Sequence, residues 1–190
     1  RDTDRSRGLG DVYKRQAEEL FETGESCYDA VIIATPHKTH KELALKAFAK
    51  GKAFIPFVTC GDPSLDVTEK IVYAMEEAGA DLIELGIPFS DPTAEGPVIQ
   101  GANLRALSGG VTTDKVFDMV EKIRKNSSIP MVFMTYANVV FSYGIERFCK
   151  RAAEVGMDGM ILPDVPFEEK GELSGCLLYT SPSPRDRSVS

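Results

Sequence analysis

The sequence predicts an α/β fold, a partial (β/α)8 barrel of about four βα units preceded by one extra βα unit. Short β-branched runs alternate with amphipathic helical segments, and this order requires parallel strands joined by right-handed crossovers. The distance along the sequence from one expected strand to the next suits the βα units of a barrel. The alternative is an open doubly wound sheet, but no G-x-G-x-x-G pattern follows any strand, which removes the usual sign of a dinucleotide site there.

The expected strands are short apolar runs bounded by turn residues. Thr35-Pro36 ends the first run, Gly61-Asp62-Pro63 closes the second, and Pro130 opens the fourth. The five expected strands cover residues 28–34, 53–59, 81–87, 131–136 and 158–162.

The expected helices carry apolar residues every three or four positions. Ser64 or Asp66 can cap the second helix, which runs to Gly79, and Gly156 ends the last one. The expected helices cover residues 38–50, 65–78, 113–125 and 145–155, and a long loop is expected over residues 88–102.

The composition is that of one globular domain, or one and a half, with 43% apolar residues, 27% charged residues and a formal net charge of −7. No apolar run approaches the roughly 20 residues that cross a bilayer, and the N-terminus lacks an apolar signal core, so we expect a cytoplasmic protein without membrane contact. The acidic balance argues against a nucleic-acid partner. The cysteines show neither C-x-x-C nor C-x-H spacing, so no metal site is expected.

The two ends break this composition. Residues 1–16 are RDTDRSRGLGDVYKRQ, residues 176–190 are CLLYTSPSPRDRSVS, and neither segment has apolar periodicity. Residues 1–16 can be back-translated into a DNA sequence whose opposite strand, read one base in, encodes all of residues 176–190. The ends therefore resemble a translated library-preparation adapter, and we expect both to be disordered tails outside the fold.

Glu84 is the most informative single residue, because it is a carboxylate in the middle of an expected apolar strand. Side chains alternate along a strand, so Glu84 shares a face with Leu82 and Gly86, while the bulkier Ile83 and Leu85 face the helices. Burial without a partner raises the pKa of a glutamate and suits it to proton transfer near neutral pH. The structural alternative is a buried carboxylate bonded to backbone amides or to a tyrosine.

The long loop after this strand holds two more acids, Asp91 and Glu95. Either could be a simple turn former or a solvated charge. Long loops at the carboxyl ends of barrel strands are usually functional, however, so Glu84 and Glu95 are candidates for an acid and base pair that faces one pocket.

The other candidates are weaker. His37 and His40 suit a surface pair better than a metal site, because a third ligand is missing. Phe57 and Tyr136 either line an aromatic pocket or fill the core, and the methionines of the strands are expected to be core residues.

Five runs of the sequence carry a specific resemblance: FIPFVTCGDPSLD, AGADLIELGIPFSDPTAEGPVIQGANLRAL, GVTTDKVFDMVEKIR, MTYANVVFSYGIERF and GMDGMILPDVPFEE. Together they resemble the alpha chain of tryptophan synthase over residues 46–172. The resemblance implies a (β/α)8 barrel that cleaves indole-3-glycerol phosphate into indole and glyceraldehyde 3-phosphate by a retro-aldol step in tryptophan biosynthesis. It also implies a beta-chain partner in an α2β2 complex and no metal or organic cofactor.

The resemblance also implies roles for single residues. Glu84 in LIELG matches the general acid and base, and Glu95 in PTAEGP matches the acid that stabilises charge at the indole nitrogen, where the family usually has an aspartate. Phe57, Met134 and Tyr136 match positions of the indole pocket.

Asp91, followed by Pro92, matches the loop that signals to the beta chain. Barrel enzymes bind phosphate after strands seven and eight. The expected strands stop well short of these, so we expect the chain itself to be inactive as an enzyme.

The segment DAVIIATPHKTHKELALKAFAKGK, in residues 28–52, resembles a βα unit of NAD-dependent dehydrogenases of the glucose–fructose oxidoreductase type. The predicted organisation is therefore a chimera: a tail over 1–16, a dehydrogenase-like unit over 17–52, half of an alpha-chain barrel over 53–175 and a tail over 176–190. Two alternative functions stay open: an NAD-dependent oxidoreductase fragment, and a non-catalytic docking module for the beta chain.

Overall fold

The computed structural model describes residues 51, 53–92 and 95–165. These residues belong to two compact units, one with residues 51, 53–55 and 79–81 and the other with residues 56–78, 82–92 and 95–165. In the first unit the Phe54 N–H donates to Asp81 Oδ2 at 2.7 Å, and the Asp81 N–H donates to the Phe54 carbonyl at 2.9 Å. Both predicted tails, both histidines and nearly all of the unit predicted over 17–52 lie outside the described residues.

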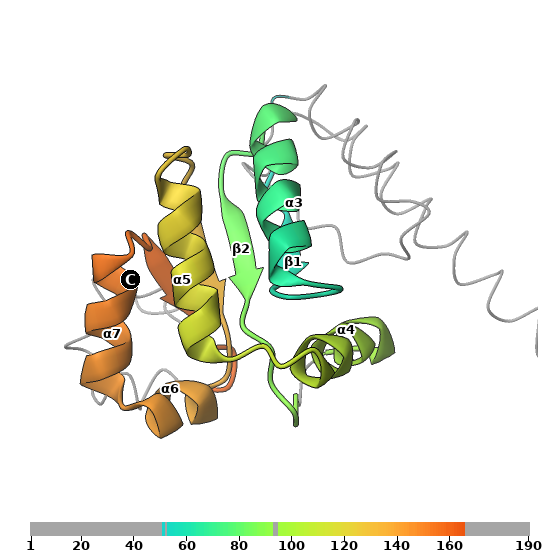
Figure 1. The fold of residues 1–190 in the computed structure, drawn as a ribbon, viewed down its shortest axis with the longest axis vertical. Helices are drawn as coiled ribbons and strands as arrows, with labels where there is room; N and C mark the ends of the chain where they lie inside the picture. Colours follow the sequence, from blue (N-terminus) through green and yellow to red (C-terminus); the bar gives the residue numbers. More distant parts are fainter. Residues whose placement is uncertain (1–50, 52, 93–94, 166–190) are drawn as a thin grey trace, which may run out of the picture. The chain divides into compact units, whose positions relative to one another are not determined.

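The second unit is built on a four-stranded parallel sheet in which the strands follow one another in chain order (Figure 1). The strands are β1 (Phe57–Thr59), β2 (Ile83–Gly86), β3 (Met131–Met134) and β4 (Gly159–Ile161), so the four strands predicted here are confirmed but shorter than expected. A doubly wound sheet reverses its strand order at a switch point. The four described strands show no such reversal.

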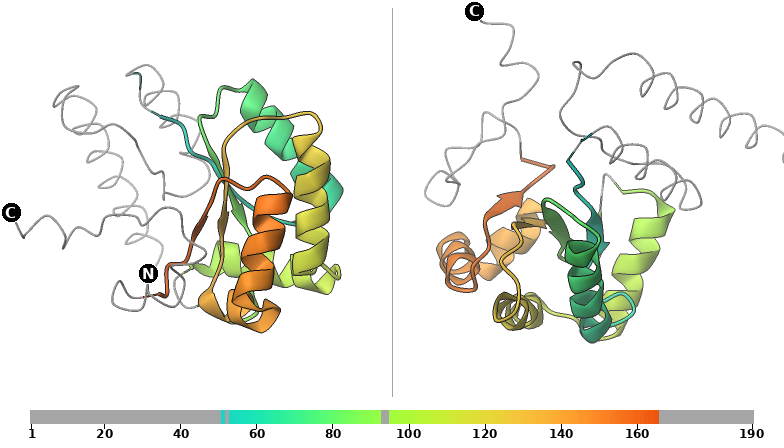
Figure 2. Two further views of the ribbon diagram at one scale, coloured as in Figure 1. Left: turned by 90° about the vertical axis from the view of Figure 1, so that its left-hand side faces the viewer. Right: turned by 90° about the horizontal axis from the view of Figure 1, so that it is seen from above.

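Three predicted helices cover one face of this sheet. They are α3 (Leu65–Glu77), α5 (Thr113–Arg124) and α7 (Ile145–Glu154), and Figure 2 shows them side by side on the same side of the strands. Ser64, and not Asp66, caps α3: its Oγ accepts from the Val67 N–H at 3.3 Å. Such caps satisfy donors that the first turn of a helix leaves unpaired.

Two further helices, α4 (Pro97–Ser108) and α6 (Ala137–Tyr143), were not predicted. The loop expected over residues 88–102 was wrong in its second part, because α4 begins at Pro97. Proline at the first helical position loses no hydrogen bond, so the Gly96-Pro97 pair that indicated a loop in fact starts a helix. Both helices lie at the carboxyl ends of the strands, the end toward which the arrow of β2 points in Figure 1.

An aromatic cluster joins the helices to the sheet. Phe117 of α5, Phe133 of β3 and Phe148 of α7 are all buried, at 0%, 0% and 1% exposure. Their rings meet edge to face, with centroids 5.5, 5.1 and 6.0 Å apart, which is a favourable geometry for aromatic pairs. The cluster therefore fixes α5 and α7 against the third strand.

We expect Phe117→Ala to lower the free energy of unfolding by about 3–5 kcal/mol, the range for a truncated core phenylalanine. Phe141→Ala is the matched control, because Phe141 is 44% exposed and its truncation leaves no cavity. Urea unfolding measures both variants. Equal losses in the two variants would contradict the assignment of Phe117 to the core.

Candidate active site

Glu84 lies in the middle of β2 on the face turned away from the helices. Ile83 and Leu85, on either side of it in the chain, are fully buried, whereas Glu84 is half-buried. Because side chains alternate along a strand, this pattern places Glu84 opposite the helix-covered core. The predicted face of Glu84 is confirmed.

The environment of Glu84 favours its protonated form. Burial raises the pKa of this carboxyl group above its ordinary value. Within the described residues the Glu84 carboxylate makes no hydrogen bond or ion pair that would oppose this effect. A raised pKa makes a carboxyl group a better proton donor than an ordinary glutamate, and it can still accept a proton once ionised.

Apolar side chains of the neighbouring strands share this face with Glu84. In the sheet register Phe57 of β1 stands beside Glu84, and Met134 of β3 stands beside Gly86. A Cβ at Gly86 would lie 2.6 Å from Cζ of Phe57. The Phe57 ring therefore lies against Gly86, where a larger residue would collide with it. Phe57, Glu84 and Met134 are therefore brought together on one face.

A hydrogen bond connects the loop after β2 to the end of β3. The Tyr136 hydroxyl donates to Oε2 of Glu95, and the Tyr136 ring packs on Phe89 with the centroids 5.3 Å apart. Tyr136 is 4% exposed, and it lies at the N-cap of α6, beyond β3 and not in the strand as expected. This hydrogen bond joins Glu95 to Tyr136. Within the described residues the Glu84 carboxylate takes no part in it, so the predicted acid and base pair of Glu84 and Glu95 stays a prediction.

Asp91 and Pro92 occupy the same loop. The Asp91 carboxylate is exposed and accepts a hydrogen bond of 2.5 Å from Oγ of Ser90, and Pro92 is half-buried. This local contact shapes the loop and leaves the carboxylate open to solvent.

One contact at the strand ends was missed from the sequence. The Asp164 carboxylate, after β4, accepts from the Ala137 N–H at the start of α6 at 3.0 and 3.1 Å. It supplies the cap that Tyr136 does not provide. The position of Asp164 just beyond an expected strand was the available signal, because polar residues there gather at the carboxyl end of a parallel sheet.

A cavity of about 360 Å³ lies at the same end of the sheet, but it is a different place from the Glu84 face. None of the predicted site residues lines it. Its walls come from the start of the loop after β2, the α4–α5 connection and α6, and they include Ile87, Phe89, Val111, Asn138 and Tyr143.

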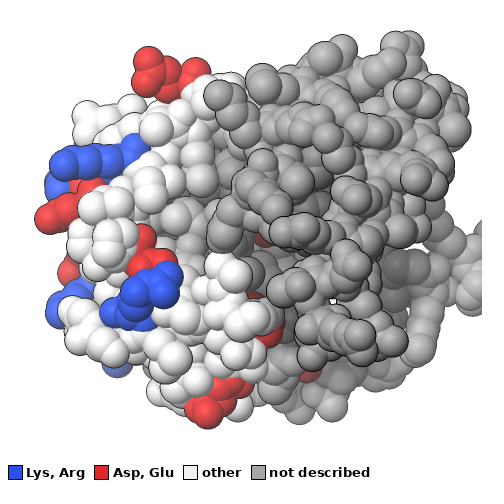
Figure 3. All heavy atoms as spheres, turned by 90° about the vertical axis from the view of Figure 1, so that its right-hand side faces the viewer, with Lys and Arg blue, Asp and Glu red and all other residues white. Residues whose placement is uncertain are grey.

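The described residues carry mixed surface charge. On the face drawn in Figure 3, acidic and basic side chains lie next to one another and form no single basic patch among the described residues. In this part of the chain there is also no helix long and apolar enough to cross a membrane, and no group of three side chains placed to hold a metal ion.

Comparison with known proteins identifies the family. The family model described as tryptophan synthase alpha chain matches residues 43–178. This chain belongs to that family. It is 53% identical over 135 residues to the tryptophan synthase alpha chain of Alkaliphilus metalliredigens, covering 71% of this chain and 50% of that protein. It is also 52% identical over 122 residues to the tryptophan synthase alpha chain of Clostridium kluyveri, covering 64% of this chain and 46% of that protein.

Solved tryptophan synthase structures have the same fold. The alpha subunit from Legionella pneumophila matches with a TM-score of 0.64 and 41% identity, over 72% of this chain and 53% of that chain. A tryptophan synthase complex from Pyrococcus furiosus matches with a TM-score of 0.62 and 39% identity, over 65% and 51%. The chain spans about half the length of the relatives it matches. The segment predicted to resemble a dehydrogenase unit lies outside the described residues apart from residue 51, as do both predicted tails, so these expectations stay predictions.

The raised pKa of Glu84 predicts how the stability of this alpha-chain segment depends on pH. The folded state keeps the Glu84 proton to a higher pH than the unfolded chain does, so this group makes stability fall as pH rises from about 4.3 through the folded pKa. Glu84→Gln removes that loss. We expect the variant to match the parent below about pH 4 and to exceed it at neutral pH in urea unfolding.

Glu77→Gln is the control for this measurement, because Glu77 is an exposed residue at the end of α3. It should not show the same gain at neutral pH. A Glu84→Gln variant less stable than the parent at neutral pH would contradict the finding that, among the described residues, this carboxylate has no partner.

Proposed function

We propose that this chain is the part of a tryptophan synthase alpha chain that holds the proton-transferring groups for cleavage of indole-3-glycerol phosphate. The observation that carries the proposal is the environment of Glu84: a half-buried carboxyl group with a raised pKa, on the sheet face it shares with Phe57 and Met134. Family membership supplies the reaction, and this geometry supports the role of Glu84.

The proposal includes the arrangement of the sheet. We infer that β1–β4 and their helices are the first four βα units of a (β/α)8 barrel. Consecutive strand order and helices on one face support this, as does the match to about half of the Legionella alpha subunit. In such a barrel Glu84 faces the interior near the carboxyl ends of the strands, where barrel enzymes perform their chemistry.

The reaction can be written with one acid–base group. Protonated Glu84 donates its proton to C3 of the indole ring, which leaves positive charge at the ring nitrogen. The bond from C3 to the glycerol carbon then breaks, and its electron pair returns to the ring. The hydroxyl on that carbon becomes an aldehyde as its proton passes to the Glu84 carboxylate, so indole and glyceraldehyde 3-phosphate leave and Glu84 is regenerated.

Glu95 would stabilise the positive charge at the indole nitrogen in this scheme. Its carboxylate is already oriented by the Tyr136 hydroxyl, and Phe57 and Met134 offer an apolar wall for a flat ring. No step needs a metal or an organic cofactor. Phosphate sites in barrels follow strands seven and eight, so we propose that the 190-residue chain alone turns over little substrate.

We also propose that this chain acts in the cytoplasm and docks to a beta chain through α6 and the loop of Asp91 and Pro92. One structural match is an α2β2 complex from Pyrococcus furiosus. Phe141 of α6 is 44% exposed, and the Asp91 carboxylate faces solvent. A non-catalytic docking module is the alternative function, and the same exposed residues favour it.

A graft tests the catalytic proposal. Residues 53–165 replace the matching segment of the Alkaliphilus metalliredigens alpha chain, and cleavage of indole-3-glycerol phosphate is assayed with the beta chain present. We expect the graft to be active and Glu84→Gln to reduce kcat by about 10²–10⁴, the contribution of general acid–base catalysis. Glu95→Asp, which restores the family's usual residue, should remain active. Undiminished turnover by Glu84→Gln would reject the proposed role.

The docking proposal is tested by binding of the same graft to a beta chain. Phe141→Ser and Asp91→Ala should each weaken binding measured by calorimetry, because each removes an exposed contact at the strand ends. Lys125→Ser is the matched control, since Lys125 is an exposed residue at the C-cap of α5. Binding unchanged in both test variants would exclude this surface, and a graft that binds without turnover would favour the docking module.

A further inference from the structure

A two-pronged ion pair joins the last turn of α4 to the loop after β1. Arg105 Nε donates to Asp62 Oδ1 at 2.8 Å, and its terminal Nη2 donates to Asp62 Oδ2 at 2.7 Å. These hydrogen bonds hold the pKa of the Asp62 carboxyl below its usual value. Paired donors of this kind fix direction as well as distance. The proposed reaction gives neither residue a task.

Asp62 is presented by a loop with little freedom of its own. The Gly61 N–H donates to the buried Thr68 hydroxyl at 2.9 Å, and the Cys60 N–H donates to the Gly86 carbonyl at 2.8 Å. Gly61 has a φ of +87°, and a Cβ there would lie 2.3 Å from a methyl of Val111, in the α4–α5 connection. Asp62 is therefore a fixed anchor beside the end of α4.

Within the described part of the chain, the helix that contains Arg105 has few other attachments. The buried residues of α4 are small or polar, namely Ala102, Asn103 and Ala106, while Val98 and Leu104 are 56% and 59% exposed. Its N-cap, Gly96, provides no side-chain hydrogen bond. A helix with so little apolar burial needs another contact to hold its orientation.

A side-chain hydrogen bond attaches the backbone of Glu95 to α4. The side-chain amide of Gln100, in the first turns of α4, donates to the Glu95 carbonyl at 2.9 Å. The Glu95 backbone thus moves with the helix, while its carboxylate reaches Tyr136 at the end of β3. A shift of α4 would change where that carboxylate lies.

We propose that Arg105 and Asp62 form a clamp that positions Glu95 through α4, so that both are positioning residues for the charge-stabilising carboxylate. This inference rests on the proposed function of Glu95. The clamp holds the far end of α4 at β1, and the Glu95–Tyr136 bond holds the near end at β3. Lysine cannot replace Arg105, because a single ammonium group lacks the planar fork that engages both carboxylate oxygens.

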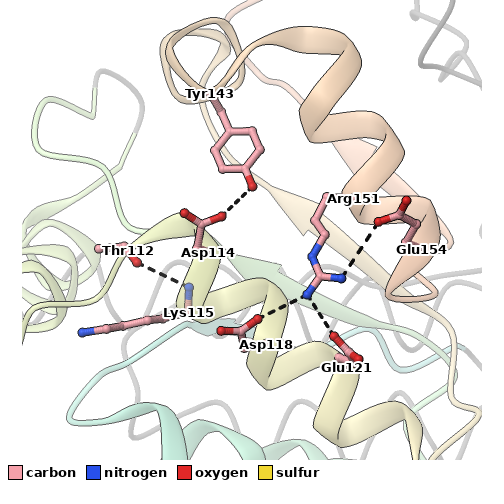
Figure 4. A network of polar contacts seen from close by, with 8 residues as sticks. All are labelled: Thr112, Asp114, Lys115, Asp118, Glu121, Tyr143, Arg151 and Glu154. Carbon is pink, nitrogen blue, oxygen red and sulfur yellow. Dashed lines mark hydrogen bonds and ion pairs between the residues drawn. The ribbon is translucent and has the colours of Figure 1, made fainter.

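Hydrogen exchange on the 190-residue chain tests the clamp without any assay of activity. Arg105→Gln should speed the exchange of α4 amides by about fivefold, the upper range for an exposed pair, with the amides of β3 as the internal reference. Arg151→Gln is the matched control. It removes an arginine that pairs with Asp118 and Glu121 on α5, shown in Figure 4, and should leave α4 unchanged. Unchanged α4 exchange in Arg105→Gln would overturn the clamp.

The graft described above tests whether the clamp acts through Glu95. Arg105→Gln should lower kcat about tenfold when Glu95 is present, with KM little changed, because small misplacements of a reacting group cost rate. In a Glu95→Ala background the same change should cost nothing further. Asp62→Asn should match Arg105→Gln, and the two together should cost no more than one alone.

Equal losses in both backgrounds would overturn the positioning role and make the pair merely structural. The proposed function fails by a different result, namely unimpaired cleavage by Glu84→Gln and Glu95→Ala. In that case Arg105→Gln should still speed the hydrogen exchange of α4. Failure of the proposed function can therefore be told apart from failure of the clamp.

Discussion

The parallel register of β2 between β1 and β3 is the constraint on which the site depends. Ile83 and Leu85 are fully buried, and a slip of one residue would exchange them for Glu84 on the helix-covered face. The apolar core thus keeps the one carboxylate of this strand on the other face. Its raised pKa is a direct result of that placement, because no described group compensates for the lost water.

Around this strand, polar contacts between distant segments order the carboxyl end of the sheet. Tyr136 holds Glu95, Asp164 caps α6, and Arg105 holds Asp62. Each contact connects the end of one strand to a segment that follows another. Loops at this end of a parallel sheet can therefore be as well positioned as the strands.

Glu95 stands where the family resemblance leads one to expect an aspartate. A glutamate side chain has one more rotatable bond than an aspartate, so it loses more conformational entropy when its carboxylate is held in one position. The hydrogen bond from Tyr136 fixes its carboxylate, and the Phe89 ring packs against the same tyrosine. The added methylene is thus accommodated by a neighbour at the end of the next strand.

By itself the sequence determined the strands, the helices α3, α5 and α7, and the face of Glu84, because all of these follow from local periodicity. It did not determine α4, which starts at a Gly-Pro pair typical of a turn and has weak apolar periodicity, or α6, which is only seven residues long. Only the tertiary structure decided that Tyr136 meets Glu95, 41 residues away, and that Arg105 meets Asp62, 43 residues away. Such pairs depend on how strands and helices pack, and no local pattern in a single sequence encodes that distance.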